Sequence, residues 1–339
     1  MTMAVNYQNK KLPKNLGLNS KLVRAGSLRS NFGETSEAIF LNSGFCYNDA
    51  FEAESRFNGE APGYVYSRYL NPNLKMLEER LIALEEGAEA ASVMASGMAA
   101  VFASIMAQIK AGDHLIASRV LFGSCFHIVT QILPNYGIEV SLVDGADKAA
   151  WQAAFKANTK VVFIESPANP NLALVDIAYV AELTKKHQAS LIVDNIFAGP
   201  LGQKPLNLGA DIVIYSTTKH LDGQGRSLGG AVLGKEAFIK EQLLPFYRHT
   251  GPALSPFNAW LILKSLETYQ LREQRHAENA LAIAQFLETQ AAVEKVLYPG
   301  LASHPQAALA KRQMTSFGGM IAFQIKGDKA ASFAFLNRL

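Results

Sequence analysis

Three apolar runs of the sequence end in polar side chains, whose carboxylate, hydroxyl and amine groups could take part in one reaction. Ser190–Asp194 ends on a carboxylate, Val161–Asn169 ends on polar residues and a proline turn, and Ile212–Lys219 ends on hydroxyl side chains and an amine. Ligands bind at the carboxyl ends of strands in open parallel sheets. We therefore expect these three ends to face one crevice.

Lys219 and Asp194 have the chemistry that an aldehyde cofactor needs. Burial at a strand end would favour the neutral amine of Lys219, the form that condenses with an aldehyde. Pyridoxal phosphate (PLP) also needs a carboxylate beside its ring nitrogen, because the protonated ring is the electron sink. Either residue alone could be an ordinary surface lysine or a turn aspartate. Their joint occurrence in chain order favours a cofactor site.

The phosphate of such a cofactor needs hydroxyls and backbone N–H groups at a helix start. Ser96, Gly97 and Met98 open a predicted helix, and Ser216 and Thr218 come just before the lysine. These five residues are the candidate phosphate site.

Hydrophobic patterns predict the elements that position these residues. Leucines at helical spacing predict a helix over 71–86. Short apolar runs then alternate with helical stretches such as Ile177–His187, which is typical of a mostly parallel α/β sheet. The runs are Leu115–Ala117, Glu139–Val143, Lys160–Ile164, Ser190–Val193 and Ile212–Tyr215.

The uncharged segment Ala90–Ile109 is long enough to cross a membrane, but its composition argues against this. Small residues dominate it, and Ser96-Gly97 would break a continuous helix. We expect a buried strand, a turn and a buried helix.

The patterning divides the chain into three parts. Residues 1–60 lack a sustained period and predict an N-terminal arm, and residues 61–253 predict a PLP-binding α/β domain. Residues 254–339 predict a C-terminal α+β domain that is incomplete, with helices over 256–275 and 278–290 and a strand over 320–325.

Charge and cysteine content favour a small-molecule enzyme of the cytoplasm. The net charge is +3 and the basic residues are scattered, so neither nucleic acid nor a membrane surface is an expected partner. Cys46 and Cys125 are the only cysteines, which fits a reducing compartment, and no signal-peptide pattern begins the chain.

Five segments of the sequence together resemble the Cys/Met metabolism family of PLP enzymes, the cystathionine γ-synthase-like proteins of fold type I. The resemblance runs from about residue 20 to the end of the chain. The segments are Tyr66–Pro72, Ala95–Ala100, Glu165–Pro170, Val193–Asn195 and Ser216–His220.

The resemblance implies a role for each matching residue. Lys219 would carry the cofactor, Asp194 would pair with the pyridinium nitrogen, and Asn169 would lie near the ring's phenolic oxygen. Ser96, Gly97, Met98, Ser216 and Thr218 would hold the phosphate. Tyr66 and Arg68 would reach the phosphate of a neighbouring subunit, in a homotetramer built from dimers that share active sites.

Two segments narrow the expected reaction. Phe122 stands where many relatives carry a tyrosine that stacks on the cofactor, so stacking is kept but the hydroxyl is lost. Asp222–Gly230 resembles the O-succinylhomoserine sulfhydrylases. This implies γ-replacement, in which O-succinylhomoserine and sulfide give homocysteine and succinate. The acetyl ester as donor, cystathionine γ-synthase activity and methionine or cystathionine γ-lyase activity stay open.

The family usually binds the substrate α-carboxylate with an arginine late in the C-terminal domain, and this chain ends before that position. Arg338 is no evident replacement. Because a guanidinium–carboxylate pair is a major positioning device, we expect PLP binding with weak or no turnover. An inactive fragment of the fold is the remaining alternative.

Overall fold

The structure is a computed structural model that describes residues 13 and 15–339. The contacts divide the chain into two compact units. The first holds the residues up to Ile109 with Asp211–Gln270, and the second holds Lys110–Ala210 with Leu271–Leu339. The predicted boundaries at residues 60 and 253 stay a prediction, and the start of the predicted arm lies outside the described residues.

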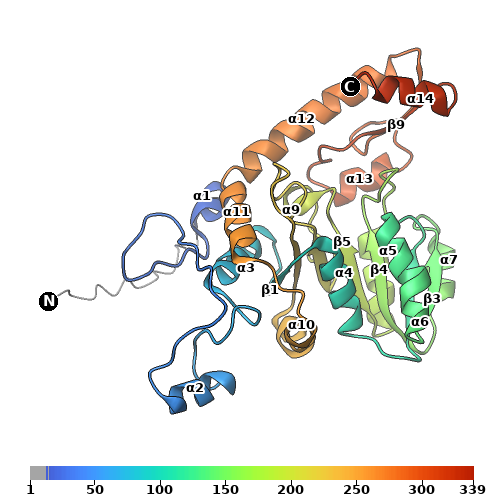
Figure 1. Ribbon diagram of the computed structural model, residues 1–339. Helices are drawn as coiled ribbons and strands as arrows, with labels where there is room; N and C mark the ends of the chain where they lie inside the picture. The colour runs from blue at the N-terminus through green and yellow to red at the C-terminus, as the bar shows by residue number, and fades with distance from the viewer. Residues whose placement is uncertain (1–12, 14) are drawn as a thin grey trace. The chain divides into compact units, whose positions relative to one another are not determined.

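Three antiparallel strands form the sheet of the first unit. β7 (Gly230–Gly234) pairs on one side with β1 (Ala90–Met94) and on the other with β6 (Ile212–Tyr215). The α-helices of this unit are α1 (Leu18–Arg24), α2 (Ala50–Phe57), α3 (Pro72–Leu84), α4 (Gly97–Met106), α10 (Leu244–Thr250) and α11 (Pro256–Leu266). A π-helix precedes α10 at Phe238–Leu243. In Figure 1, α2 lies apart from the strands of this unit.

Four parallel strands form the main sheet of the second unit. They are β2 (His114–Ser118), β3 (Glu139–Val143), β4 (Thr159–Glu165) and β5 (Ser190–Asp194), in the order β5, β4, β2, β3. A separate antiparallel pair joins β8 (Val293–Leu297) to β9 (Ala322–Ile325). The predicted α/β class with mainly parallel pairing is confirmed.

The helices of the second unit connect these strands. They are α5 (Gly123–His127), α6 (Leu133–Asn135), α7 (Lys148–Ala154), α8 (Ile177–Lys186), α9 (Gly199–Gly202), α13 (Ala307–Gln313) and α14 (Lys329–Leu336), with a π-helix at Ile128–Ile132. Trp151 of α7 and Val180 of α8 join Ile164 and Val193 of the strands in one buried cluster. That cluster fixes the two strands whose ends carry Glu165 and Asp194.

Most predicted elements are present, and the errors lie at the two ends of the chain. The strand, turn and helix expected over Ala90–Ile109 form as β1 and α4. Short α1 and α2 were missed, and α2 buries none of its residues. The predicted helix break near residue 276 is wrong, because α12 runs unbroken over Tyr269–Glu288. No glycine or proline marks its true start.

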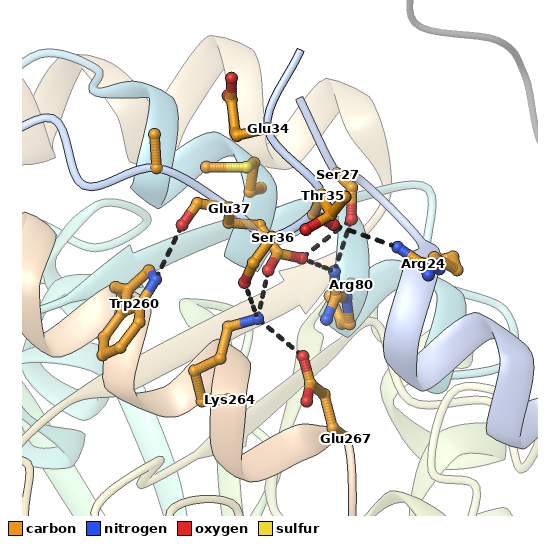
Figure 2. A network of polar contacts seen from close by, with 12 residues as sticks. Arg24, Ser27, Glu34, Thr35, Ser36, Glu37, Arg80, Trp260, Lys264 and Glu267 are labelled. Carbon is orange, nitrogen blue, oxygen red and sulfur yellow. Dashed lines mark hydrogen bonds and ion pairs between the residues drawn. The ribbon is translucent and has the colours of Figure 1, made fainter. Parts of the chain in front are cut away.

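A buried ion pair ties the N-terminal segment of the first unit to α3 and α11 (Figure 2). Arg80 Nη2 lies 2.7 Å from Glu37 Oε1, and Lys264 of α11 donates to the other oxygen of Glu37. Arg80 also donates to the carbonyls of Leu22 and Ala25, each at 2.8 Å. Burial alone would raise the pKa of Glu37, but the bonds from Lys264 and Arg80 outweigh it and lower the pKa to about 2.

Two buried asparagines hold the extended segment that follows Glu37. Asn73 donates to the Ala38 carbonyl at 2.7 Å and accepts from the Phe40 amide at 2.8 Å. Asn71 caps α3 and donates to the Phe40 carbonyl at 2.9 Å and to Ser67 Oγ at 3.0 Å. The start of α3 therefore fixes the path of the chain on both sides of Tyr66.

We predict that Glu37→Gln destabilises the chain by roughly 3–5 kcal/mol, because it leaves the Arg80 guanidinium buried without its counter-charge. Urea unfolding near neutral pH measures this loss. Glu236→Gln, which removes an exposed ion pair with Lys240, is the control and should cost less than about 1 kcal/mol. Equal losses in the two variants would contradict a dominant role for the buried pair.

Candidate functional site

Lys219 lies in a tight turn directly after β6. Its amide donates to the Ser216 carbonyl at 3.2 Å, and its own carbonyl accepts from Gly223 at 2.7 Å. Asp222 closes the same turn by donating to the Thr217 carbonyl at 2.9 Å. The side chain of Lys219 is exposed, whereas the sequence argument expected it to be buried. The turn therefore fixes the backbone and leaves the amine accessible.

The loop after Lys219 is held by the carboxylate of Asp222, which is fully buried. Asp222 accepts from the Arg226 amide at 2.8 Å and from Ser265 Oγ of α11 at 3.1 Å. The Arg226 guanidinium lies 3.4 Å from the same carboxylate. The segment that resembles the sulfhydrylases is thus a closed loop built around one acidic side chain.

Because Gly97 and Gly230 have no side chains, Ser96, Gly97 and Ser216 lie close together within the first unit. A Cβ on Gly97 would lie 2.6 Å from the Cβ of Ser216, and a Cβ on Gly230 would lie 2.1 Å from the Ser96 carbonyl oxygen. Glycine is therefore required at both positions. Ser96 caps α4 by accepting from the Ala99 amide at 3.1 Å. The result is a helix start packed directly against the hydroxyl of Ser216.

Thr218 and Met98 are the two remaining residues predicted to bind the phosphate. The Thr218 hydroxyl donates to the Gly229 carbonyl at 3.2 Å and accepts from the Gly229 amide at 3.0 Å. It thereby ties the lysine turn to the start of β7. Met98 is half-buried in the first turn of α4. Its backbone amide is the group that a helix start offers to a phosphate.

Two carboxyl groups lie at the buried ends of neighbouring parallel strands in the second unit. Glu165 ends β4 and Asp194 ends β5, and they are direct partners in the strand register. Burial raises the pKa of both, and the charge of Asp194 raises that of Glu165 further. Within this unit no lysine, arginine or histidine forms an ion pair with either carboxyl group.

Glu165 is a site residue that sequence reasoning missed. One of its oxygens accepts from the Phe122 amide at 2.6 Å, and the other accepts from the Asn169 amide at 2.8 Å. It therefore positions both loops that carry the predicted ring contacts. The signal was available, since Glu165 ends a buried strand with a carboxylate just as Asp194 does.

A chain of buried amide side chains supports these strand ends. Gln203 donates to the Ser166 carbonyl and to Asn195 Oδ1, both at 2.8 Å. Gln313 of α13 donates to Gln203 Oε1 at 2.9 Å and to the Val175 carbonyl at 3.0 Å. The residues that follow Glu165 and Asp194 are therefore joined to one another and to α13.

Tyr66 and Arg68 lie close together in the first unit. Tyr66 is 42% exposed, and the Arg68 guanidinium lies 5.5 Å from the centre of its ring and 4.8 Å from that of Tyr69. Arg68 also donates to the Arg248 carbonyl. The guanidinium is thus positioned by neutral groups rather than neutralised by a carboxylate.

These features fit PLP on two independent grounds. Asp194 is a buried carboxylate whose only hydrogen bond in its unit comes from the Ile196 amide at 3.1 Å, so a protonated ring nitrogen would supply its missing counter-charge. The Gly97 and Gly230 contacts leave a helix start and a serine hydroxyl side by side, which suits a phosphate.

Comparison with known proteins gives one consistent family. The model of the family described as Cys/Met metabolism PLP-dependent enzyme matches residues 19–339. The sequence is 49% identical to the O-succinylhomoserine sulfhydrylase of Pseudomonas aeruginosa over 315 residues, which are 93% of this chain and 78% of the relative. It is 42% identical to the L-methionine gamma-lyase of Porphyromonas gingivalis, over 95% of this chain and 81% of the relative.

Solved structures show the same fold. MetB from Corynebacterium glutamicum matches with a TM-score of 0.89 at 36% identity, covering 95% of this chain and 82% of that chain. A structure from Campylobacter jejuni matches with a TM-score of 0.88 at 28% identity, covering 92% and 85%. That structure carries N'-pyridoxyl-lysine-5'-monophosphate. The expected α/β fold of the PLP enzymes of fold type I is therefore confirmed.

We predict that the cofactor-free protein loses stability as the pH rises from about 4 to about 8, between the ordinary pKa values of Asp194 and Glu165 and their raised ones. A carboxyl group whose folded pKa is raised keeps its proton in the folded state at pH values where the unfolded chain has lost it. The loss should be on the order of 2 kcal/mol, measured by urea unfolding across that range.

Asp194→Asn should reduce this slope, because the amide has no proton to lose and no longer adds to the raised pKa of Glu165, which burial still keeps raised. Asp147→Asn, at the exposed cap of α7 where asparagine caps equally well, should leave the slope unchanged. A slope of undiminished size in Asp194→Asn would show that other groups cause it.

Proposed function

Because this chain belongs to the Cys/Met metabolism PLP-dependent enzyme family and uses pyridoxal phosphate, we propose that it catalyses γ-replacement on O-succinylhomoserine with sulfide. The products would be homocysteine and succinate. The 49% identity to a sulfhydrylase supports this choice of substrates. The observation that carries the cofactor chemistry is the uncompensated, buried Asp194 carboxylate.

We propose that the residues which match the family's motifs hold the cofactor. When bound, PLP supplies an aldehyde that condenses with amines and a protonated ring that withdraws electrons from the substrate. Asp194 keeps the ring nitrogen protonated, and Asn169 and Phe122 contact the ring. Ser96, Gly97, Met98, Ser216 and Thr218 hold the phosphate. Glu165 fixes the loops of Phe122 and Asn169 through their backbone amides.

The amine of Lys219 is the proposed general acid–base. This amine would hold the cofactor through its aldehyde and, when free, would take a proton from the bound substrate and return one to it. Phe122 has no hydroxyl to share this work, although its exposed ring can still stack. Proton transfer therefore rests on Lys219 at the end of its fixed turn.

We propose that the active enzyme is a homotetramer of dimers that share active sites. The exposed Tyr66 and the Arg68 guanidinium beside it suit the phosphate of a neighbouring subunit. Cys46 and Cys125 form no disulfide bond, in keeping with a cytoplasmic enzyme. Among the described residues no helix is long and apolar enough to cross a membrane.

We predict that homocysteine forms from O-succinylhomoserine only when sulfide is present. The assay compares O-succinylhomoserine, O-acetylhomoserine and methionine, each with and without sulfide, and identifies the products by mass spectrometry. The proposal is tested by the identity of the product and not by the rate, so slow turnover is compatible with it. Lys219→Ala should lower the rate at least about 10²-fold, because it removes the proton-transferring amine.

Lys240→Ala, which removes an exposed lysine outside the proposed site, serves as the matched control and should retain the parent rate. Breakdown of methionine without sulfide as the main reaction would instead favour a γ-lyase. Product formation that survives Lys219→Ala would contradict the role given to this lysine.

A further inference from the structure

A pocket lies in the second unit, away from the residues proposed to hold the cofactor. It has a volume of about 370 Å³ and opens between α7, the start of α8 and α13. None of its lining residues belongs to the cofactor site described above. The volume falls within the range of small-molecule sites, which is about 300–1,000 Å³.

The walls of this pocket are apolar, and the polar groups beside them already have partners. Ala308, Leu309 and the ring of Tyr179 provide the accessible apolar surface, while the lining side chains of Trp151 and Val180 are fully buried. The Trp151 indole N–H donates to the Gly145 carbonyl at 3.2 Å, and the Tyr179 hydroxyl donates to the Lys148 carbonyl at 3.0 Å. A ligand would therefore meet apolar surface in the interior of the pocket.

Two cations and one carboxylate line the mouth of the pocket. Arg312 Nη2 lies 2.7 Å from Asp176 Oδ2, and Lys148 Nζ lies 3.7 Å from the same oxygen. The other oxygen of Asp176 accepts from the Tyr179 amide at 3.3 Å, where it caps α8. One carboxylate thus serves two cationic side chains, each more than 60% exposed. The mouth keeps a charge of +1 that a second carboxylate would neutralise.

We propose that this pocket binds a small monocarboxylate with an apolar body. The carboxylate of the ligand lies between Lys148 and Arg312 beside Asp176, and its apolar part contacts Leu309 and the ring of Tyr179. Because the mouth of the pocket carries a net positive charge, it excludes amines of the same shape. The apolar walls disfavour fully polar anions, because these would lose hydration without gaining hydrogen bonds.

Three molecules of one shape test the charge preference on the cofactor-loaded protein. The probes are 3-phenylpropanoate, 3-phenylpropan-1-ol and 3-phenylpropylamine, and calorimetry measures their binding. We expect the carboxylate to bind at least about tenfold more tightly than the alcohol, because it gains charge-assisted hydrogen bonds. The amine should show no saturable binding. Equal affinity of all three, or no binding of the carboxylate, would overturn the proposal.

Variants locate the binding. Lys148→Gln with Arg312→Gln should weaken 3-phenylpropanoate about tenfold or more, and Ala308→Phe should abolish binding by filling the pocket. Lys186→Gln, an exposed charge at the far end of α8, is the matched control and should bind as the parent does. Circular dichroism confirms that each variant is folded. Undiminished binding in the folded Ala308→Phe variant would place the ligand elsewhere and refute the site.

Discussion

Two carboxyl groups buried side by side cannot both keep their charge without cationic partners, and the second unit supplies none to Glu165 or Asp194. The two groups meet this constraint differently. Glu165 accepts two backbone amides and thereby holds the Phe122 and Asn169 loops. Asp194 accepts one amide and keeps the capacity to pair with a cation. A protonated pyridine ring is such a cation, which supports the role proposed for Asp194.

The lysine side of the site depends on a different constraint, which is close backbone packing. Gly97 and Gly230 have no room for a side chain, so the start of α4, the end of β6 and β7 approach one another directly. The turn that carries Lys219 is closed by its own backbone bonds and by Thr218. Rigidity of the backbone thus coexists with an accessible amine, which suits a residue that must be displaced and then move protons.

Much of this could be predicted from the sequence, because the informative residues lie at the ends of apolar runs. The strands that precede Asp194, Lys219 and the Ser96-Gly97 turn were predicted in this way and are present, while the roles of these residues in the site stay predictions. Glu165 also ends a buried strand with a carboxylate, but its role was missed because its contact with the Phe122 amide, 43 residues away in the chain, leaves no pattern in the sequence. The Gln203 and Gln313 chain was hidden for the same reason. The two N-terminal helices were missed because they are only seven and eight residues long, too short for a sustained period.

The most direct test of the central claim is to locate the cofactor on the chain. Borohydride reduction of the PLP-loaded protein makes the bond between the lysine and the cofactor permanent, and peptide mass spectrometry then identifies the modified residue. We expect one modified peptide, the one that contains Lys219. In the Asp194→Asn variant this modification should be lost, because cofactor binding is weakened. Modification of another lysine, or of many lysines to similar extents, would contradict it.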